Sequence, residues 1–210
     1  GHSVYSKLGQ YTDIKDLDAV VISHYHPDHY ADLYALSHAV RSAIFQGIRK
    51  EPLRVFLPSP SDAFNYFSGK NELKVGMMTD GGKNQVRGLE LQYFKAEHSV
   101  PGFAVKVSSD HSSIFYSGDT VYNNKLAEAS SAVDVLLIET TMVGAEQDFA
   151  QTRGHMTTRD VARWGRISHP GLLVATHFWD GYNPEQIHAE LSETCRGKFI
   201  LAHEGLSINI

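Results

Sequence analysis

The sequence predicts an α/β layered fold, in which short strands alternate with helices along the chain. Strand patterns are short apolar runs rich in β-branched residues, and the first of them covers residues 17–23. Helix patterns carry apolar residues along one face, as Leu33, Leu36 and Val40 do in the stretch 32–45. Because strands and helices alternate, we expect the functional side chains to lie on loops at the ends of strands.

The remaining elements follow the same two patterns in order. A glycine-containing stretch, 69–82, is predicted to be loop and short helix. Apolar runs predict strands at 53–57, 89–94, 103–107, 113–117, 133–138, 172–176 and 198–201. Periodic stretches predict further helices at 61–67, 124–130, 157–168 and 184–192.

The composition is that of one soluble globular domain spanning residues 1–210. Hydrophobic residues make up 42% and charged residues 20%, so a sizeable core can be buried. The net charge is −5 and the Lys and Arg residues are scattered, so strong nucleic-acid binding is not expected. No apolar run has membrane-spanning length, so no membrane partner is expected. The single cysteine, Cys195, excludes a disulfide framework and a cysteine-based zinc site, and the expected compartment is a reducing cytoplasm.

Four residues of metal-ligand type stand together in the segment 23–29, directly after the first predicted strand. The string His-x-His-x-Asp-His would arise by chance in roughly one in a few hundred sequences of this composition. In an extended segment alternate residues point to one side, so His24 and His26 can hold one metal ion together. Asp28 and His29 then turn toward a second ion. The segment therefore predicts a two-metal site.

This segment and later ones, in the expected order over about residues 1–206, resemble motifs of the metallo-β-lactamase superfamily. The later ones contain His98 after a strand, Asp119 in a Gly-Asp-Thr turn, and His177 at a late strand end. Taken singly, these three residues fit ordinary surface and turn positions. The resemblance implies a four-layer αββα metallo-β-lactamase sandwich. It also implies one metal ion bound by His24, His26 and His98, a second bound by Asp28, His29 and His177, and Asp119 as the bridging ligand.

The bridging residue separates the branches of that superfamily. Zinc β-lactamases of the commonest class have a cysteine where this chain has Asp119, so lactam hydrolysis is not expected. The segment 154–162, which begins Gly-His-Met-Thr, resembles a ribonuclease Z-type element that brings a further histidine, here His155, to the site. An acidic residue at the end of the preceding strand, Glu139, is also similar. The resemblance therefore implies a ribonuclease Z-like phosphodiesterase.

The link between the motifs of His98 and Asp119 narrows the expected substrate. Ribonuclease Z usually carries a long arm there that grips transfer RNA, whereas here 20 residues separate the two and look like a hairpin through residues 110–112. We therefore expect a small-molecule or nucleotide-type phosphodiester as the substrate. The alternatives are a ribonuclease Z-like RNA endonuclease, a thioester or lactone hydrolase of the glyoxalase II type, and a non-catalytic scaffold without metals.

The resemblance also implies cofactors and catalytic residues. Two divalent metal ions, zinc or alternatively manganese or iron, would supply a metal-bound hydroxide at neutral pH. Asp28 would orient this hydroxide or take its proton, and His155 would protonate the leaving oxygen. The alternative for His155 is a helix cap or a solvent-facing position. Phe178, Trp179 and Tyr182 form either an aromatic wall for the substrate or loop packing.

One departure from the family concerns the beginning of the chain. Residues 1–8 resemble a segment that normally follows the first strands, so the usual N-terminal strands are expected to be lacking. An edge left open in this way would face a partner, and a homodimer is the expected assembly. The other histidines considered are not expected to be ligands, and most are expected in solvent: His38, His111, His169, His188 and His203.

Overall fold

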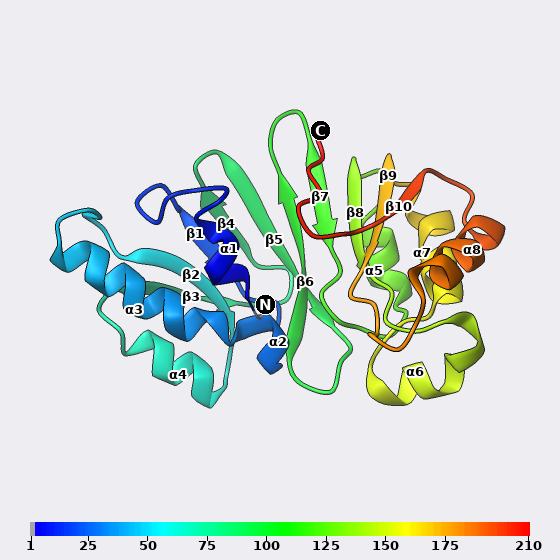
Figure 1. The fold of residues 1–210 in the computed structure, drawn as a ribbon, viewed down its shortest axis with the longest axis horizontal. Coiled ribbons are helices and arrows are strands. Elements are labelled where there is room, and N and C mark those ends of the chain that lie inside the picture. The colour runs from blue at the N-terminus through cyan, green and yellow to red at the C-terminus, as the bar shows by residue number, and fades with distance from the viewer. Residues whose placement is uncertain (1–2) are drawn as a thin grey trace. The chain divides into compact units, whose positions relative to one another are not determined.

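The computed structural model describes residues 3–210, which divide into two compact units that meet in sequence between Asp80 and Gly81 (Figure 1). Each unit contains a β-sheet with helices packed against it, as the alternation of patterns predicts. The expectation of one domain over residues 1–210 stays a prediction. Among the described residues, no helix combines the length and the apolar content that crossing a membrane requires.

The first unit is built on a three-stranded parallel sheet. Its elements are α1 (Val4–Leu8), β1 (Ala19–Val21), α2 (Pro27–Tyr30), α3 (Asp32–Phe45), β2 (Leu53–Pro58), α4 (Asp62–Ser68) and β3 (Leu73–Met78). The strands lie in the order β1, β2, β3, so helices connect each strand to its parallel neighbour. The helix predicted at 32–45 is confirmed in full as α3. Its apolar face, with Leu36 and Val40, is buried in one cluster with Val55 of β2.

The strand β3 shows that the prediction of loop and short helix at 69–82 is wrong. β3 pairs in parallel register with the whole of β2, and Leu73 at its start is buried. Its pattern is hidden in the sequence because a lysine and Gly76 interrupt the apolar run. The glycine has a packing reason, since a Cβ at Gly76 would lie 2.8 Å from Cδ1 of Phe56.

The second unit is built on a seven-stranded mixed sheet. Its elements are β4 (Lys83–Val86), β5 (Leu89–Ala96), β6 (Gly102–Ser108), β7 (Ser113–Tyr116), α5 (Asn124–Ala129), β8 (Val135–Glu139), the 3-10 helix η1 (Gly144–Glu146), α6 (Gln147–Arg153), α7 (Thr158–Ser168), β9 (Leu172–Thr176), α8 (Pro184–Thr194) and β10 (Phe199–Leu201). The strand order is β10, β9, β8, β7, β6, β5, β4. The predicted hairpin through residues 110–112 is confirmed as the turn between β6 and β7. The sequence patterns do not predict β4, η1 or α6.

The core of the second unit lies between its sheet and the helices α5, α7 and α8 (Figure 1). Trp164 of α7 is fully buried, and its Nε1 donates a hydrogen bond of 2.8 Å to Oγ of Ser130. Leu126 of α5 and Leu191 of α8 are buried in the same cluster as Leu136 of β8. Burial of these apolar faces, more than helix propensity, holds the three helices on the sheet.

Five strands of the second unit, β5, β7, β8, β9 and β10, end at the same edge of its sheet, and β10 runs parallel to β9. β7, β8 and β9 run parallel to one another, and β5 runs in the same direction because β6 is antiparallel to both of its neighbours. Loops that follow the carboxyl ends of these strands therefore lie together. His98, Asp119, Glu139 and His177 stand at or just after these ends.

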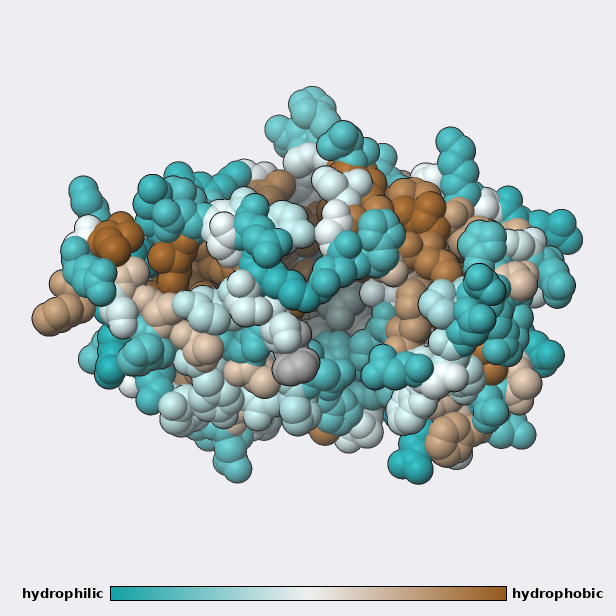
Figure 2. Space-filling model, in the orientation of Figure 1, coloured by the Kyte–Doolittle hydropathy of each residue, from teal (hydrophilic) through white to brown (hydrophobic). Residues whose placement is uncertain are grey.

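β10 is the strand at one edge of the second sheet, so only one of its two sides is paired with another strand. Its three residues are half-buried. On the face shown in Figure 2, hydrophobic side chains gather over β9 and β10. An edge of this kind is a surface on which a partner can pair. The predicted homodimer stays a prediction.

Candidate metal centre

Four of the predicted ligands lie together in the first unit, two on the loop after β1 and two in the helix α2 that follows it. His24 is buried, and its Nδ1 lies 3.1 Å from Oγ of Ser23. Its other ring nitrogen, Nε2, lies 3.2 Å from Nδ1 of His26. Two nitrogens bound to one tetrahedral zinc ion at about 2.0–2.1 Å lie about 3.3 Å apart. These two ring nitrogens are therefore spaced like two ligands of one metal ion.

A helical turn positions the next two residues of the loop. α2 begins at Pro27, whose fixed φ suits a first helical position, and His26 is the extended residue before it. Within the turn, Oδ2 of Asp28 lies 3.2 Å from Nε2 of His29, and the rings of His29 and His24 are 4.0 Å apart. His26 is thus the last extended residue before the helical turn that carries Asp28 and His29. That these two residues bind a second metal ion stays a prediction.

Tyr25 anchors this loop to the neighbouring strand. Its hydroxyl donates a hydrogen bond of 2.6 Å to the carbonyl oxygen of Pro58, the last residue of β2. Burial raises the pKa of Tyr25 to about 12, so the phenol keeps the proton that it donates. This hydrogen bond therefore attaches the loop after β1 to the end of β2.

In the second unit, Asp119 lies at the centre of three histidines. The residue follows β7, and its side chain is buried. Its Oδ2 lies 3.4 Å from Nε2 of His177, 4.0 Å from Nε2 of His98 and 4.0 Å from Nδ1 of His155. Single ligand atoms of Asp119, His155 and His177 all lie within 4.8 Å of one another. A buried carboxylate surrounded by imidazoles is typical of a metal site.

A backbone carbonyl orients His98. Its Nδ1 lies 2.8 Å from the carbonyl oxygen of Gly154. Because a carbonyl only accepts, the proton of the neutral ring lies on Nδ1 and Nε2 carries the lone pair that faces Asp119. Gly154 has a φ of +80°, and a Cβ there would lie 2.6 Å from Nδ1 of His98. Only glycine lets the backbone approach the ring this closely.

His177 has a backbone conformation that is uncommon for residues other than glycine. It directly follows β9 and has a φ of +59°. This conformation directs Nε2 toward Asp119, while Nδ1 lies 2.9 Å from Oγ1 of Thr141. Strain of this kind costs about 1–3 kcal/mol and clusters at functional sites. The strained φ is therefore a second indication that His177 has a functional role.

The buried carboxylate of Glu139 ties the loops of this group together. Its Oε1 accepts a hydrogen bond of 3.1 Å from the N–H of Thr120 and lies 3.1 Å from Nδ1 of His155. Its Oε2 accepts from the N–H groups of Thr141 and Met156, at 3.2 Å each. The hydroxyl of Thr141 also donates to Oε2, over 2.7 Å. One carboxylate thus holds the loops that carry Asp119, His155 and Thr141.

His155 does not cap a helix. The N-cap of α7 is Thr157, whose side chain accepts from the N–H of Asp160 in a capping box. His155 is instead half-buried, with its ring 4.9 Å from that of His98 and 5.6 Å from that of His177. The structure therefore places His155 next to the candidate ligands His98, Asp119 and His177.

The donor set fits a divalent metal ion. Imidazole nitrogens and carboxylate oxygens are ligands of zinc, manganese and iron. The hydrogen bonds to His98 and His177 resemble the outer contacts that orient ligands in metal sites. Each predicted ligand set combines residues of both units, so the two sets stay a prediction.

The structure separates the other predicted residues into exposed and packed ones. Of the three aromatic residues after His177, Phe178 and Tyr182 pack against the core, whereas Trp179 is exposed. Sequence patterns missed the roles of Thr141 and Gly154, which become visible only as contacts between loops. Five further histidines of the described residues are exposed, as expected for most of them: His38, His111, His169, His188 and His203.

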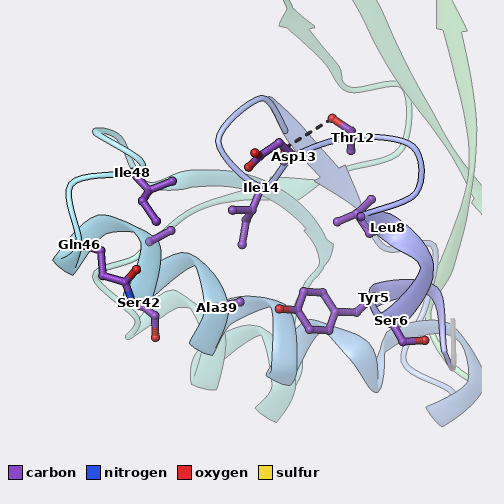
Figure 3. A pocket seen from close by; sticks show the side chains of 12 residues that line it. Tyr5, Ser6, Leu8, Thr12, Asp13, Ile14, Ala39, Ser42, Gln46 and Ile48 are labelled. Carbon is purple, nitrogen blue, oxygen red and sulfur yellow. Dashed lines mark hydrogen bonds between the residues drawn. The ribbon is translucent and has the colours of Figure 1, made fainter.

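A separate cavity of about 730 Å³ lies in the first unit, between α1, the loop after it and α3 (Figure 3). The described residues that line it include no histidine, cysteine or glutamate. Its one carboxylate, Asp13, accepts a hydrogen bond of 3.0 Å from the N–H of Lys15, which lowers the pKa of that carboxyl. This lining lacks the donors of a metal site.

Comparisons with known proteins show the family of this chain and support its fold. A family model described as the beta-lactamase superfamily domain matches residues 5–178. The probable metallo-hydrolase YhfI of Bacillus subtilis is 27% identical over 207 residues, covering 98% of this chain and 84% of that protein. Ribonuclease Z of Ignicoccus hospitalis is 24% identical over 224 residues, covering 83% of this chain and 74% of that protein.

Solved structures confirm the predicted fold class. The crystal structure of the metallo-beta-lactamase fold protein YhfI matches with a TM-score of 0.93 at 24% identity, covering 98% of this chain and 83% of that one. Human tRNase Z, short form, matches with a TM-score of 0.70 at 17% identity, covering 100% of this chain and 86% of that one.

Proposed function

Since the chain belongs to the β-lactamase superfamily, we propose that it is a metal-dependent hydrolase, and more narrowly a phosphodiesterase acting on a small or nucleotide-type phosphodiester. The observation that carries the narrower proposal is the position of His155, with Nδ1 3.1 Å from Oε1 of Glu139 and 4.0 Å from Oδ2 of Asp119. A histidine in this position can serve the leaving group of an ester. Proteins named ribonuclease Z and tRNase Z are among the relatives.

The proposed metal ligands come from the motif order and from the donor geometry within each unit. When bound by these residues, two divalent ions would lower the pKa of a bound water and would neutralise the charge of phosphate oxygens. We expect zinc, with manganese and iron as alternatives. The proposed sets are His24, His26 and His98 for one ion, Asp28, His29 and His177 for the other, and Asp119 for both.

Two residues have proposed catalytic roles. The side chain of Asp28 is 60% exposed, so besides binding metal it can accept a proton from the attacking water. In its protonated form, His155 keeps the proton on Nδ1 directed at Glu139 and Thr141. The proton on Nε2 is then the one donated to the departing oxygen. The negative charge of Glu139 stabilises this positively charged ring.

A ribonuclease Z-like RNA endonuclease is the second candidate, because relatives carry that name. The segment between His98 and Asp119 argues against this candidate, because it forms only the β6–β7 hairpin where ribonuclease Z usually carries a long arm. The net charge of −5 also disfavours a long polyanion as the substrate. Strong nucleic-acid binding is therefore not part of the proposal. A homodimer and a cytoplasmic location stay predictions.

The proposal is tested with a panel of three ester classes. Purified protein is assayed on bis(p-nitrophenyl) phosphate, a glutathione thioester and a homoserine lactone, before and after chelation. We expect phosphodiester hydrolysis that chelator abolishes and that zinc or manganese restores. Far more efficient hydrolysis of the thioester or the lactone would place the activity in the glyoxalase II-type branch. No hydrolysis by zinc-loaded protein would favour the non-catalytic scaffold.

A further inference from the structure

The second unit contains a cavity of about 390 Å³ beside His155. Small-molecule sites typically occupy about 300–1,000 Å³, so the cavity is large enough for a compact ligand. Phe149, Arg153 and Trp179 line it together with His155. A substrate whose reacting group lies at His155 would therefore extend into this cavity.

Two large aromatic side chains are exposed in the cavity. Phe149 is 47% exposed and Trp179 is 59% exposed. The other Phe, Tyr and Trp side chains of residues 81–210 are buried or half-buried. Covering an apolar ring with a planar group removes its surface from water, which lowers the free energy of the complex. Stacking on aromatic side chains is a usual way to bind a nucleobase.

The backbone holds Trp179 in place at the site. Its N–H donates a hydrogen bond of 3.1 Å to the carbonyl oxygen of Thr141, and its carbonyl accepts one of 3.0 Å from the N–H of Tyr182. The indole lies over Gly181, where an added Cβ would be 3.0 Å from the indole Cδ1. A ring supported in this way is a preformed platform, so little ordering is needed when a ligand binds.

Arg153 brings a positive charge to the same wall. It is the last residue of α6, and its guanidinium carbon lies 5.1 Å from the centre of the Phe149 ring, one helical turn earlier. The described residues that line the cavity include no carboxylate. Within the described residues 3–210, Arg153 forms no ion pair. Its guanidinium is therefore available for an anionic group of a ligand.

We propose that this cavity binds a nucleoside monophosphate unit of the substrate, with the base stacked on Trp179 and the phosphate bound by Arg153. The inference rests on the proposed function, because His155 places the scissile ester at the edge of the cavity. An aliphatic phosphodiester would leave both rings in water, and a neutral aromatic group would leave Arg153 without an anion. A nucleotide meets both requirements.

Binding of 5′-AMP to metal-free protein in the presence of chelator tests this inference without any catalysis. The chain has two tryptophans, and because Trp164 is fully buried, only the 59% exposed Trp179 can be quenched by a stacked base. We expect saturable quenching by 5′-AMP and none by ribose 5-phosphate. Adenosine should bind about tenfold more weakly, because it lacks the charge-assisted hydrogen bonds to Arg153.

Matched variants assign the effect to the cavity. By calorimetry, Arg153→Gln and Trp179→Ala should each weaken 5′-AMP binding by about tenfold. The exposed controls Arg196→Gln and Phe45→Ala should leave it unchanged. An absence of saturable 5′-AMP binding, or equal affinity in the wild type and both cavity variants, would overturn the inference. Hydrolysis by metal-loaded protein would then still decide the proposed function separately.

Discussion

Oγ1 of Thr141 lies 2.9 Å from Nδ1 of His177. The same hydroxyl donates its single hydrogen to Oε2 of Glu139, which is 2.7 Å away. A hydroxyl that donates to a carboxylate can only accept from an imidazole, so the proton of a neutral His177 ring lies on Nδ1. Nε2, which faces Asp119, therefore carries the lone pair that a metal ion needs.

Replacing the hydroxyl of Thr141 should weaken metal binding. Thr141→Val keeps the shape of the buried side chain but removes the acceptor that orients His177. We expect the zinc Kd to rise by about 10- to 100-fold, which is the usual effect of losing an outer partner of a ligand. Competition with a chromophoric chelator measures this Kd.

Two controls separate orientation from packing. Thr141→Ser keeps the hydroxyl and should keep the zinc Kd. Thr140→Val removes a neighbouring buried hydroxyl that donates to the carbonyl of Ile138 at 3.3 Å and contacts no ligand, so its zinc Kd should also be unchanged. An unchanged Kd in Thr141→Val would show that the hydroxyl does not orient His177.

Gly154→Ala should damage both stability and metal binding. A Cβ at this position meets Nδ1 of His98 at 2.6 Å, and the backbone φ is +80°. The left-handed φ alone costs about 1–2 kcal/mol with an L-residue. Gly88→Ala is the matched control, because Gly88 has a φ of +84° and nothing within 4 Å. Urea unfolding should show a loss in both variants, whereas only Gly154→Ala should raise the zinc Kd. Equal zinc affinity in the two variants would contradict the proposed orientation of His98.

His155→Ala separates a general acid from a metal ligand. Metal content should stay unchanged, because the proposed ligand sets do not include His155. The kcat should fall by about 10²–10⁴-fold for phosphodiesters with poor leaving groups, and less for nitrophenyl esters that leave without a proton. Loss of metal in the variant would make His155 a ligand. Full activity on both substrate types would rule out the general-acid role.

Glu190 makes part of the stability of the second unit depend on pH. Burial alone would raise its pKa, but hydrogen bonds from the hydroxyl of Thr158 and the N–H of Gly144 outweigh burial and hold the pKa below the usual 4.5. A carboxyl with a lowered folded-state pKa contributes stability above the unfolded pKa and loses it as pH falls through the folded pKa. Glu190→Gln should therefore reduce the free energy of unfolding more at pH 7 than at pH 3, whereas the exposed control Glu193→Gln should not. Urea unfolding at the two pH values measures this, and parallel losses would contradict the assignment.

Many of the regular elements, and the ligand candidates of the first motif, can be predicted from the sequence because their information is local. α3 shows a continuous apolar face, so its limits follow from the spacing of residues such as Leu36 and Val40. The histidines of segment 23–29 lie within a few residues of one another, so their motif can be recognised without knowing the fold. Glu139 follows from the resemblance to the ribonuclease Z-type group, which has an acidic residue at the end of the corresponding strand.

The features that sequence patterns missed depend on contacts made by folding. Thr141 acts on histidines 14 and 36 positions further along the chain, and no local pattern connects them. Gly154 is one glycine among 17, and only the approach of His98 explains it. β3 lacks a strand pattern because Lys74 and Gly76 interrupt its apolar run, and it forms because pairing with β2 outweighs the weak strand propensity of Gly76.

Anomalous diffraction from crystals of the zinc-loaded protein tests the central claim most directly. We expect two zinc peaks per chain, one bound by His24, His26 and His98, the other by Asp28, His29 and His177, with Asp119 bound to both. Zinc-loaded crystals in which these side chains point apart and bind no metal would contradict it.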